Sequence, residues 1–114
     1  MSVKIIIERR FKEPLAQKNL EAIEALRIPA MRQKGYISGE TLVNTEDSRE
    51  VVVISTWSDF DGFNSWSGSK ERTELENEIA PHLEGEAKIS YFMPGANAID
   101  EMFETIVHDS EIES

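Results

Sequence analysis

The stretch from Val51 to Trp66, VVVISTWSDFDGFNSW, constrains the fold most, because a β-branched run passes directly into an aromatic one. Short β-branched runs are typical of strands, so a buried strand is predicted to end near Trp57. Ser58 and Asp59 then favour a helix start, since a short side-chain oxygen accepts a hydrogen bond from a free amide of the first turn. The sequence therefore predicts a strand joined tightly to a helix.

The helix that follows carries Phe60, Phe63 and Trp66 at every third position. This spacing places the three rings on one face, which we expect to point back at the sheet. Aromatic stripes on helices are more often core than pocket, and this interpretation is favoured for Phe60 and Phe63. Trp57, Phe63 and Trp66 are also the predicted substrate-binding walls of any pocket between this helix and the sheet.

The remaining elements follow from periodicity and from turn residues. Strands are predicted at residues 3–10, 36–43, 51–57 and 87–93. Helices are predicted at residues 14–31, at 59–80 with a break at the Ser-Gly-Ser of 67–69, and after Gly95. Pro29 should bend or end the first helix at about Arg27 or Ile28, because proline lacks the amide that a helix interior needs. The last helix has apolar residues at helical spacing: Ile99, Met102, Phe103, Ile106 and Val107.

The predicted order is βαββαβ with an added helix. This order is typical of the ferredoxin-like α+β fold, a four-stranded antiparallel sheet with helices on one face. A chain of 114 residues is long enough for one such core and too short for two. We expect a single domain over residues 1–107 and a short acidic tail over residues 108–114 that frays.

The first and third predicted strands are apolar on both faces. Ile5 and Ile7 share one face and Ile6 lies on the other, and Val52 and Ile54 repeat the pattern in the third strand. Helices on one side would leave the second face in water, at a cost of roughly 1.5–3 kcal/mol for each large side chain. The same sheet of a second copy would cover it, giving a homodimer with a barrel between the subunits. The last helix folded across that face would satisfy the same pattern in a monomer.

The formal net charge of −10 argues against two classes of partner. Acidic surfaces repel the phosphates of nucleic acids and anionic membrane headgroups, so neither is expected to bind. The absence of cysteine excludes disulfides, thiolate metal sites and a thiol nucleophile. The first residues lack signal-peptide features and no apolar run approaches a membrane span, so a cytoplasmic protein is expected.

Three stretches, VKIIIERRF, GYISGETL and VVISTWSDFDGFNSWSGS, together resemble the antibiotic biosynthesis monooxygenase domain. The resemblance covers roughly residues 3–93, and its most specific part is the strand followed by Trp57, Phe63 and Trp66. It implies a dimeric α/β barrel. It also implies one of several activities: cofactor-independent oxygenation of phenolic or quinol-like aromatics, haem degradation, or no known reaction.

In the haem-degrading branch, the resemblance implies an asparagine on the first strand and a haem-ligating histidine ten residues after the tryptophan that matches Trp66. This chain has Arg9 and Glu76 at those positions. A carboxylate in place of the imidazole removes the usual iron ligand, and His82, six residues further on, cannot take that place without rearrangement. No cofactor is therefore predicted, and haem binding is the weakest of the functions considered.

Oxygenation without a cofactor needs a substrate that can itself reduce oxygen, and a pocket that deprotonates it and excludes water. The predicted catalytic residues are Trp66, Arg9 and His82. Trp66 would stack on a planar substrate and Arg9 would stabilise a phenolate or peroxide anion. His82 or Glu8 would act as the base. The alternatives are an ion pair of Arg9 with Glu8 or Glu13 at the surface or dimer interface, and an exposed helix end for His82.

No metal site is predicted. Asp59 and Asp61 lie at a helix start, where acids more often cap the helix and favour its dipole. Four further acids are expected on a solvated helix face: Glu71, Glu74, Glu76 and Glu78. The preferred function is a cofactor-independent monooxygenase acting on a small aromatic or quinone-like substrate. The alternative is a non-catalytic small-ligand-binding or regulatory dimer of the same fold.

Overall fold

The computed structural model describes residues 2–95. Its elements are β1 (Val3–Arg10), α1 (Gln17–Met31), β2 (Tyr36–Val43), β3 (Glu50–Trp57), α2 (Phe60–Ser67), α3 (Lys70–Ile79), the 3-10 helix η1 (Ala80–His82) and β4 (Lys88–Phe92). The predicted last helix and acidic tail lie outside the described residues. None of the helices described is long and apolar enough to cross a membrane.

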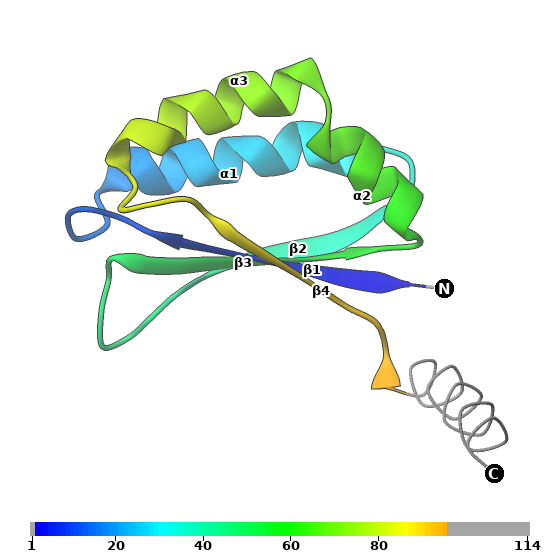
Figure 1. Ribbon diagram of the computed structural model, residues 1–114, viewed down its shortest axis with the longest axis horizontal. Coiled ribbons are helices and arrows are strands. Elements are labelled where there is room, and N and C mark those ends of the chain that lie inside the picture. Colours follow the sequence, from blue (N-terminus) through cyan, green and yellow to red (C-terminus); the bar gives the residue numbers. More distant parts are fainter. Residues whose placement is uncertain (1, 96–114) are drawn as a thin grey trace, which may run out of the picture.

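The strands form one antiparallel sheet in the order β2-β3-β1-β4. Figure 1 shows α1 and α3 side by side over one face of this sheet, with α2 at one end of the helix layer. The α+β ferredoxin-like fold predicted from the element order is confirmed, including the antiparallel pairing of β2 with β3.

The core lies between the sheet and the helices. Alternate residues of β1 face the helix layer, so Ile5, Ile7 and Arg9 are all buried. Trp57, at the end of β3, is 1% exposed and meets two rings edge to face, Tyr36 at a centroid distance of 5.3 Å and Phe63 at 5.7 Å. Edge-to-face pairs add to the stability that area burial alone provides. The core is thus centred on the junction of β3 and α2.

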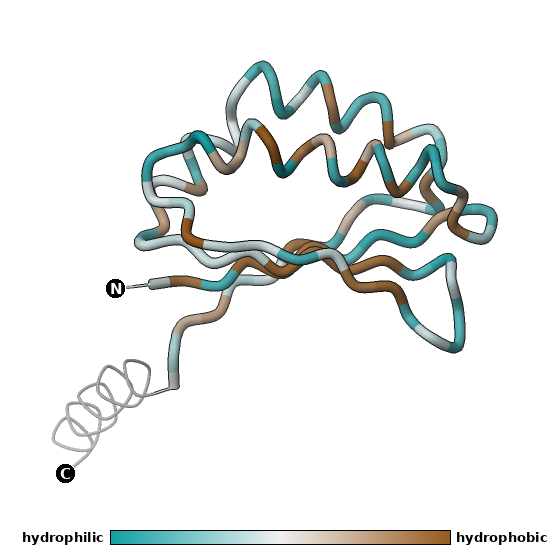
Figure 2. Tube along the Cα trace, turned by 180° about the vertical axis from the view of Figure 1, so that it is seen from behind, coloured by the Kyte–Doolittle hydropathy of each residue, from teal (hydrophilic) through white to brown (hydrophobic). Residues whose placement is uncertain are grey.

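The opposite face of the sheet carries no helix among the described residues, as Figure 2 shows from behind. The register pairs Ile6 with Ile54 at the centre of this face, and Val52 with Leu42 beside them. Leu42 remains 44% exposed, and Phe92 on the edge strand is 54% exposed. An apolar stripe of Leu42, Val52, Ile54 and Ile6 therefore crosses β2, β3 and β1 on the open face, and on β4 Phe92 lies opposite Lys4.

The helix α1 starts later than predicted and ends at Met31, as predicted. It begins at Gln17, three residues after Pro14, because the amide of Leu15 is bonded instead to the carbonyl of Ser48 in the β2–β3 turn, at 3.1 Å. The helix runs through Pro29, so the expectation that Pro29 could end it at Arg27 or Ile28 is wrong. Pro29 falls in the last turn, where its missing amide removes one hydrogen bond, and its ring is buried in the core.

The break between α2 and α3 is confirmed. The carboxylate of Asp59 caps α2 by accepting a hydrogen bond from the amide of Gly62 at 2.9 Å. The hydroxyl of Ser69 caps α3 through the amide of Arg72 at 3.2 Å. Two caps ten residues apart allow α2 to pack against the sheet end while α3 runs beside α1.

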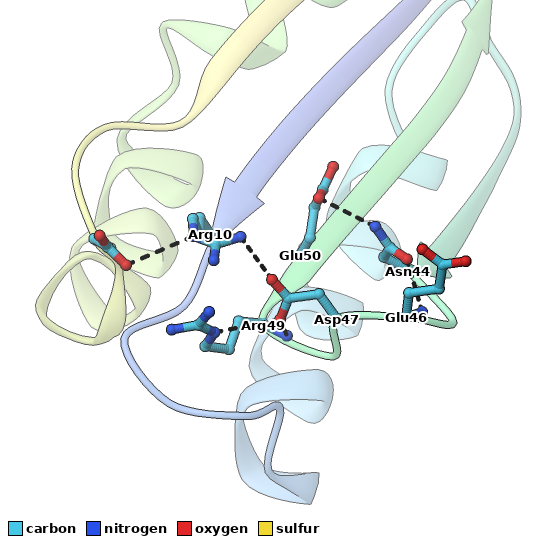
Figure 3. Close-up of polar contacts among 7 residues, drawn as sticks. Arg10, Asn44, Glu46, Asp47, Arg49 and Glu50 are labelled. Carbon is cyan, nitrogen blue, oxygen red and sulfur yellow. Dashed lines mark hydrogen bonds and ion pairs between the residues drawn. The ribbon is translucent and has the colours of Figure 1, made fainter.

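A polar network closes the end of the sheet where β1 finishes and the β2–β3 turn begins (Figure 3). Arg10 pairs with Asp47 at 2.9 Å and with Glu84 at 3.6 Å. Asp47 also accepts hydrogen bonds from the amide and guanidinium of Arg49. The network joins three segments that are distant in sequence: the end of β1, the turn and the loop before β4.

Candidate functional site

A cavity of about 50 Å³ lies between the sheet and the helix layer. Its sheet side comes from inward residues of β1, β2 and β3, and its opposite side from α1, α2 and α3. These six elements meet there because inward strand residues and the inner helix faces point at one another. The walls are of two kinds, aromatic and charged.

The aromatic wall consists of Tyr36, Trp57, Phe63 and Trp66. Phe63 and Trp66 come from one face of α2 and are 2% and 4% exposed. The indole of Trp57 is fixed by a hydrogen bond from Nε1 to the hydroxyl of Ser55, at 3.1 Å. The structure therefore brings all three predicted substrate-binding residues to one cavity.

The charged wall centres on Arg9, which is 2% exposed. Its Nη2 donates a hydrogen bond to Oε1 of Glu76 on α3, and Nη2 of Arg72 lies 3.3 Å from the same oxygen. Burial lowers the pKa of Arg9, while the charge and hydrogen bond of Glu76 act in the opposite direction. Arginine stays protonated at physiological pH, so the pair is ionic.

The surface interpretation of Arg9 is wrong in both respects. Its side chain is buried, and its carboxylate partner is Glu76 rather than Glu8 or Glu13. Glu8 lies on the other face of β1, where its carboxylate is 3.9 Å from Lys88. The two residues differ because successive side chains of a strand point to opposite faces of the sheet, so Arg9 points inward and Glu8 outward.

Glu76 is the site residue that the sequence interpretation missed. It was predicted on a solvated helix face, yet its side chain is only 23% exposed, while Glu71, Glu74 and Glu78 are exposed. A signal was present: Arg9 and Glu76 both depart from the haem-degrading pattern, and they do so with opposite charges. Opposite charges at two positions of one site predict an ion pair.

The structure places His82 apart from this cavity. It is exposed at the end of η1, and its carbonyl accepts a hydrogen bond from the amide of Lys12 at 3.0 Å. Phe60, predicted as core, is 42% exposed and packs at the sheet edge against Tyr91, with ring centroids 5.2 Å apart. Residues three apart on a helix are separated by about 300°, which is about 60° less than a full turn. The three rings therefore do not share one line along α2, and Phe60 lies outside the core.

Tyr36, Arg27 and Arg72 also line the cavity and were not predicted as site residues. Burial raises the pKa of Tyr36, and the charge of Arg27 opposes this. Arg27 donates a hydrogen bond from Nη2 to the hydroxyl of Thr41 at 2.7 Å, across from α1 to β2. Gly39 makes room for this wall, since a Cβ there would overlap the hydroxyl of Tyr36.

Within residues 2–95, no group of three or more histidine, aspartate or glutamate side chains is placed to hold a metal ion. The cavity therefore offers stacking surfaces, three guanidinium groups and one carboxylate. These groups can bind a planar ring and stabilise negative charge on it.

Several solved structures share this fold at low sequence identity. SnoaB, a cofactor-independent oxygenase from Streptomyces nogalater, superposes with a TM-score of 0.73 at 13% identity, covering 82% of this chain and 92% of that one. A putative antibiotic biosynthesis monooxygenase from Nitrosomonas europaea gives 0.75 at 12% identity, covering 82% and 89%. A conserved protein from Methanosarcina mazei gives 0.73 at 14%, covering 81% and 91%.

At these sequence identities the similarity shows a shared fold only. No curated protein sequence matches the chain. The family is shown by a comparison of the sequence with family profiles. Residues 2–77, which include β1 to α3 as far as the Arg9 and Glu76 pair, match the sequence profile described as antibiotic biosynthesis monooxygenase. The chain therefore belongs to the antibiotic biosynthesis monooxygenase family.

Proposed function

We propose that this protein is a cofactor-independent monooxygenase acting on a small aromatic or quinone-like substrate. The observation that carries the proposal is that Trp66 and Arg9 line the same cavity. A ring for stacking then lies beside a fixed positive charge, and both side chains are buried. The fold is also that of SnoaB, a cofactor-independent oxygenase.

In this proposal the substrate supplies the electrons that reduce dioxygen. One oxygen atom enters the substrate and the other leaves as water. Trp66 and Trp57 hold the ring, and the guanidinium of Arg9 stabilises the ionised substrate and the peroxide anion that forms on it. Both effects lower the barrier for a step that develops negative charge in a site of low dielectric constant.

The size of the cavity sets a condition on binding. A space of about 50 Å³ holds dioxygen or water, whereas ligand pockets are typically about 300–1,000 Å³. Substrate entry therefore requires part of the wall to move. The short helix α2 carries Phe63 and Trp66 and is separated from α3 by Gly68 and Ser69, so it is the element whose displacement enlarges the cavity most directly.

The identity of the base stays open in this proposal. His82 as the base is a prediction that would need a rearrangement, because its described position is off the cavity. Glu76 lies on the cavity but is held by two guanidinium groups. This observation supports the second candidate function, a non-catalytic small-ligand-binding or regulatory dimer. The described lining residues offer groups that bind a ligand but no free base.

The homodimer belongs to the same proposal. Its support is the apolar stripe on the open face of the sheet, where Ile6, Ile54 and Leu42 lie. A second copy would bury the stripe sheet to sheet. The cytoplasmic location likewise stays a prediction.

The test is oxygen consumption by the purified protein with a panel of naphthoquinols, with haemin titration in parallel. Substrate-dependent oxygen uptake above the uncatalysed rate is expected, without a Soret shift on adding haemin. Trp66→Phe should lower kcat/KM by about fivefold, the equivalent of about 1 kcal/mol of stacking. Phe60→Leu is the matched control, because Phe60 lies on the same helix but off the cavity.

The outcomes separate the candidates. Binding of a quinol without oxygen uptake would favour the binding dimer. A saturable Soret shift near one equivalent per subunit would move the protein to haem chemistry, in spite of Glu76 at the position where the resemblance implies a histidine.

A further inference from the structure

We propose that the ligand of this cavity is an aromatic carboxylate, a planar ring carrying a carboxylate group, and that Arg9, Arg72 and Arg27 select it by charge. The inference rests on the proposed function in that it specifies the substrate class of the same site. It depends on the electrostatics of the cavity and requires no oxygen chemistry.

The first observation is the charge of the cavity. Its charged lining residues among those described are three arginines, Arg9, Arg27 and Arg72, and one acid, Glu76. This leaves an excess of two positive charges on the wall of an interior space, in a chain whose formal net charge is −10. Partly buried charges are screened less than surface charges, so this local excess governs what the cavity accepts.

The second observation is an unused donor. The Nε of Arg9 is buried and has no hydrogen-bond partner among the described residues, and the Arg9 side chain is 1% exposed. Buried donors are almost always satisfied, and those that are not call for a missing partner. An anionic oxygen is the strongest acceptor that a guanidinium can meet, because the hydrogen bond is assisted by both charges.

The third observation is the sharing of Glu76. Two guanidinium groups, Arg9 and Arg72, are directed at one oxygen of this carboxylate. Arg27 has no carboxylate within ion-pair distance in the described part of the chain, and its Nη2 is occupied by the hydroxyl of Thr41. Arg9 and Arg72 therefore share one carboxylate where two would balance their charges, and Arg27 has no carboxylate partner among the described residues.

The aromatic half of the ligand follows from the opposite wall. Trp57, Phe63 and Trp66 present ring surfaces beside the arginines. A planar anion satisfies both walls at once, by stacking on one and pairing with the other. A neutral ring of the same shape would leave the buried positive charge without compensation.

The experiment compares two ligands of one shape. Isothermal titration of the full chain with 2-naphthoate and with 2-naphthamide should give a dissociation constant at least tenfold lower for the carboxylate. Arg72→Gln should weaken 2-naphthoate at least fivefold and leave 2-naphthamide within twofold. Arg10→Gln is the matched control: it removes the same charge from an ion-paired arginine outside the cavity, and 2-naphthoate affinity should stay within twofold.

A second variant gives a change of opposite sign. Glu76→Gln keeps a hydrogen-bond acceptor for Arg9 but removes the internal anion that competes with the ligand. It should therefore bind 2-naphthoate at least threefold more tightly than the wild type. The variant should leave 2-naphthamide within twofold, because a wall merely loosened by the substitution would raise the affinity for both ligands.

Equal affinity for the two ligands, tighter binding of the amide, or no binding of either overturns the inference. So does an Arg10→Gln effect as large as that of Arg72→Gln, or weaker 2-naphthoate binding by a folded Glu76→Gln variant. The proposed function fails separately. Carboxylate selectivity without oxygen uptake on any quinol removes the oxygenase and keeps the anion site, whereas oxygen uptake with equal affinities does the reverse.

Discussion

Arg9 of β1 and Glu76 of α3 form an ion pair across the interior of the protein, although they lie 67 residues apart in the sequence. The pair joins the sheet to the helix layer at the wall of the cavity. It therefore contributes to the fold and to the site at once, and each role can be tested by its own substitution.

Replacing Glu76 by alanine should destabilise the protein. The change leaves Arg9 buried without its counter-ion, which costs about 3 kcal/mol in comparable buried pairs. Urea denaturation would measure the loss. Glu74→Ala on the same helix is the control, because its 3.9 Å pair with Lys70 is exposed and contributes less than about 1 kcal/mol. Equal losses for the two variants would contradict a structural role for the buried pair.

Gly62 marks a close approach between α2 and the segment that precedes β2. A Cβ at this position would overlap the carbonyl oxygen of Lys34 and would lie 3.3 Å from the Trp57 ring. Because the clash is with backbone, Gly62→Ala should lower the free energy of unfolding by about 2 kcal/mol. At Gly68 the nearest atom to a new Cβ is 3.7 Å away, so Gly68→Ala should be neutral or slightly stabilising. Thermal melts of both variants check the contrast.

The turn network predicts an acid-dependent contribution to stability. Hydrogen bonds from the amide and side chain of Arg49, and then the contacts of Arg10, hold the pKa of Asp47 at about 2, below its ordinary value of 3.8. A depressed carboxyl pKa stabilises the folded state above the unfolded pKa, and the contribution is lost as the pH falls from about 4 towards 2. The difference in urea midpoint between wild type and Asp47→Asn should therefore be largest at neutral pH and shrink across that window.

A control for this titration lies in the same turn. The Glu46 carboxylate makes no ion pair within residues 2–95, so Glu46→Gln should differ little from wild type at any pH. A gap between Asp47→Asn and wild type that stays constant down to pH 2 would show that the stabilisation does not come from the ionised carboxylate.

The apolar stripe predicts the oligomeric state. Light scattering coupled to gel filtration should give twice the mass of a single chain for the wild type. Ile54→Asp, at the centre of the open face, should shift the protein towards monomer because it would place a charge in the subunit interface. Ile28→Asp makes the same change at a position on α1 that is 58% exposed, and should remain dimeric. A monomeric wild type would leave the last helix as the remaining cover for the stripe.

Local rules account for what the sequence predicted well. Asp59 and Ser69 cap α2 and α3 as expected, because a cap depends only on residues within one turn. The four strands and their pairing followed from β-branched runs and turn residues. The continuation of α1 through Pro29 did not, because Pro29 is retained by tertiary burial that no local rule contains.

Of the residues that line the candidate site, the sequence predicted three aromatic residues and Arg9, but not the partners of Arg9. Trp57, Phe63 and Trp66 reach the cavity because the β3 to α2 junction fixes their directions. The burial of Arg9 depends on the acid that α3 supplies, and the role of Arg27 depends on the hydroxyl that β2 supplies. Such pairings join elements distant in sequence, and helical periodicity assigns Glu76 and Arg27 to solvent.

The two tryptophans have a spectroscopic consequence. The chain contains only Trp57 and Trp66, and both are buried on the cavity wall. Tryptophan emission, excited selectively at wavelengths that tyrosine does not absorb, therefore originates entirely from this wall. The indole of Trp57 donates a hydrogen bond to the hydroxyl of Ser55, whereas Trp66 lies on α2, so single replacements would separate their spectra. The protein thus carries its own fluorophores at the place where a ligand would quench them.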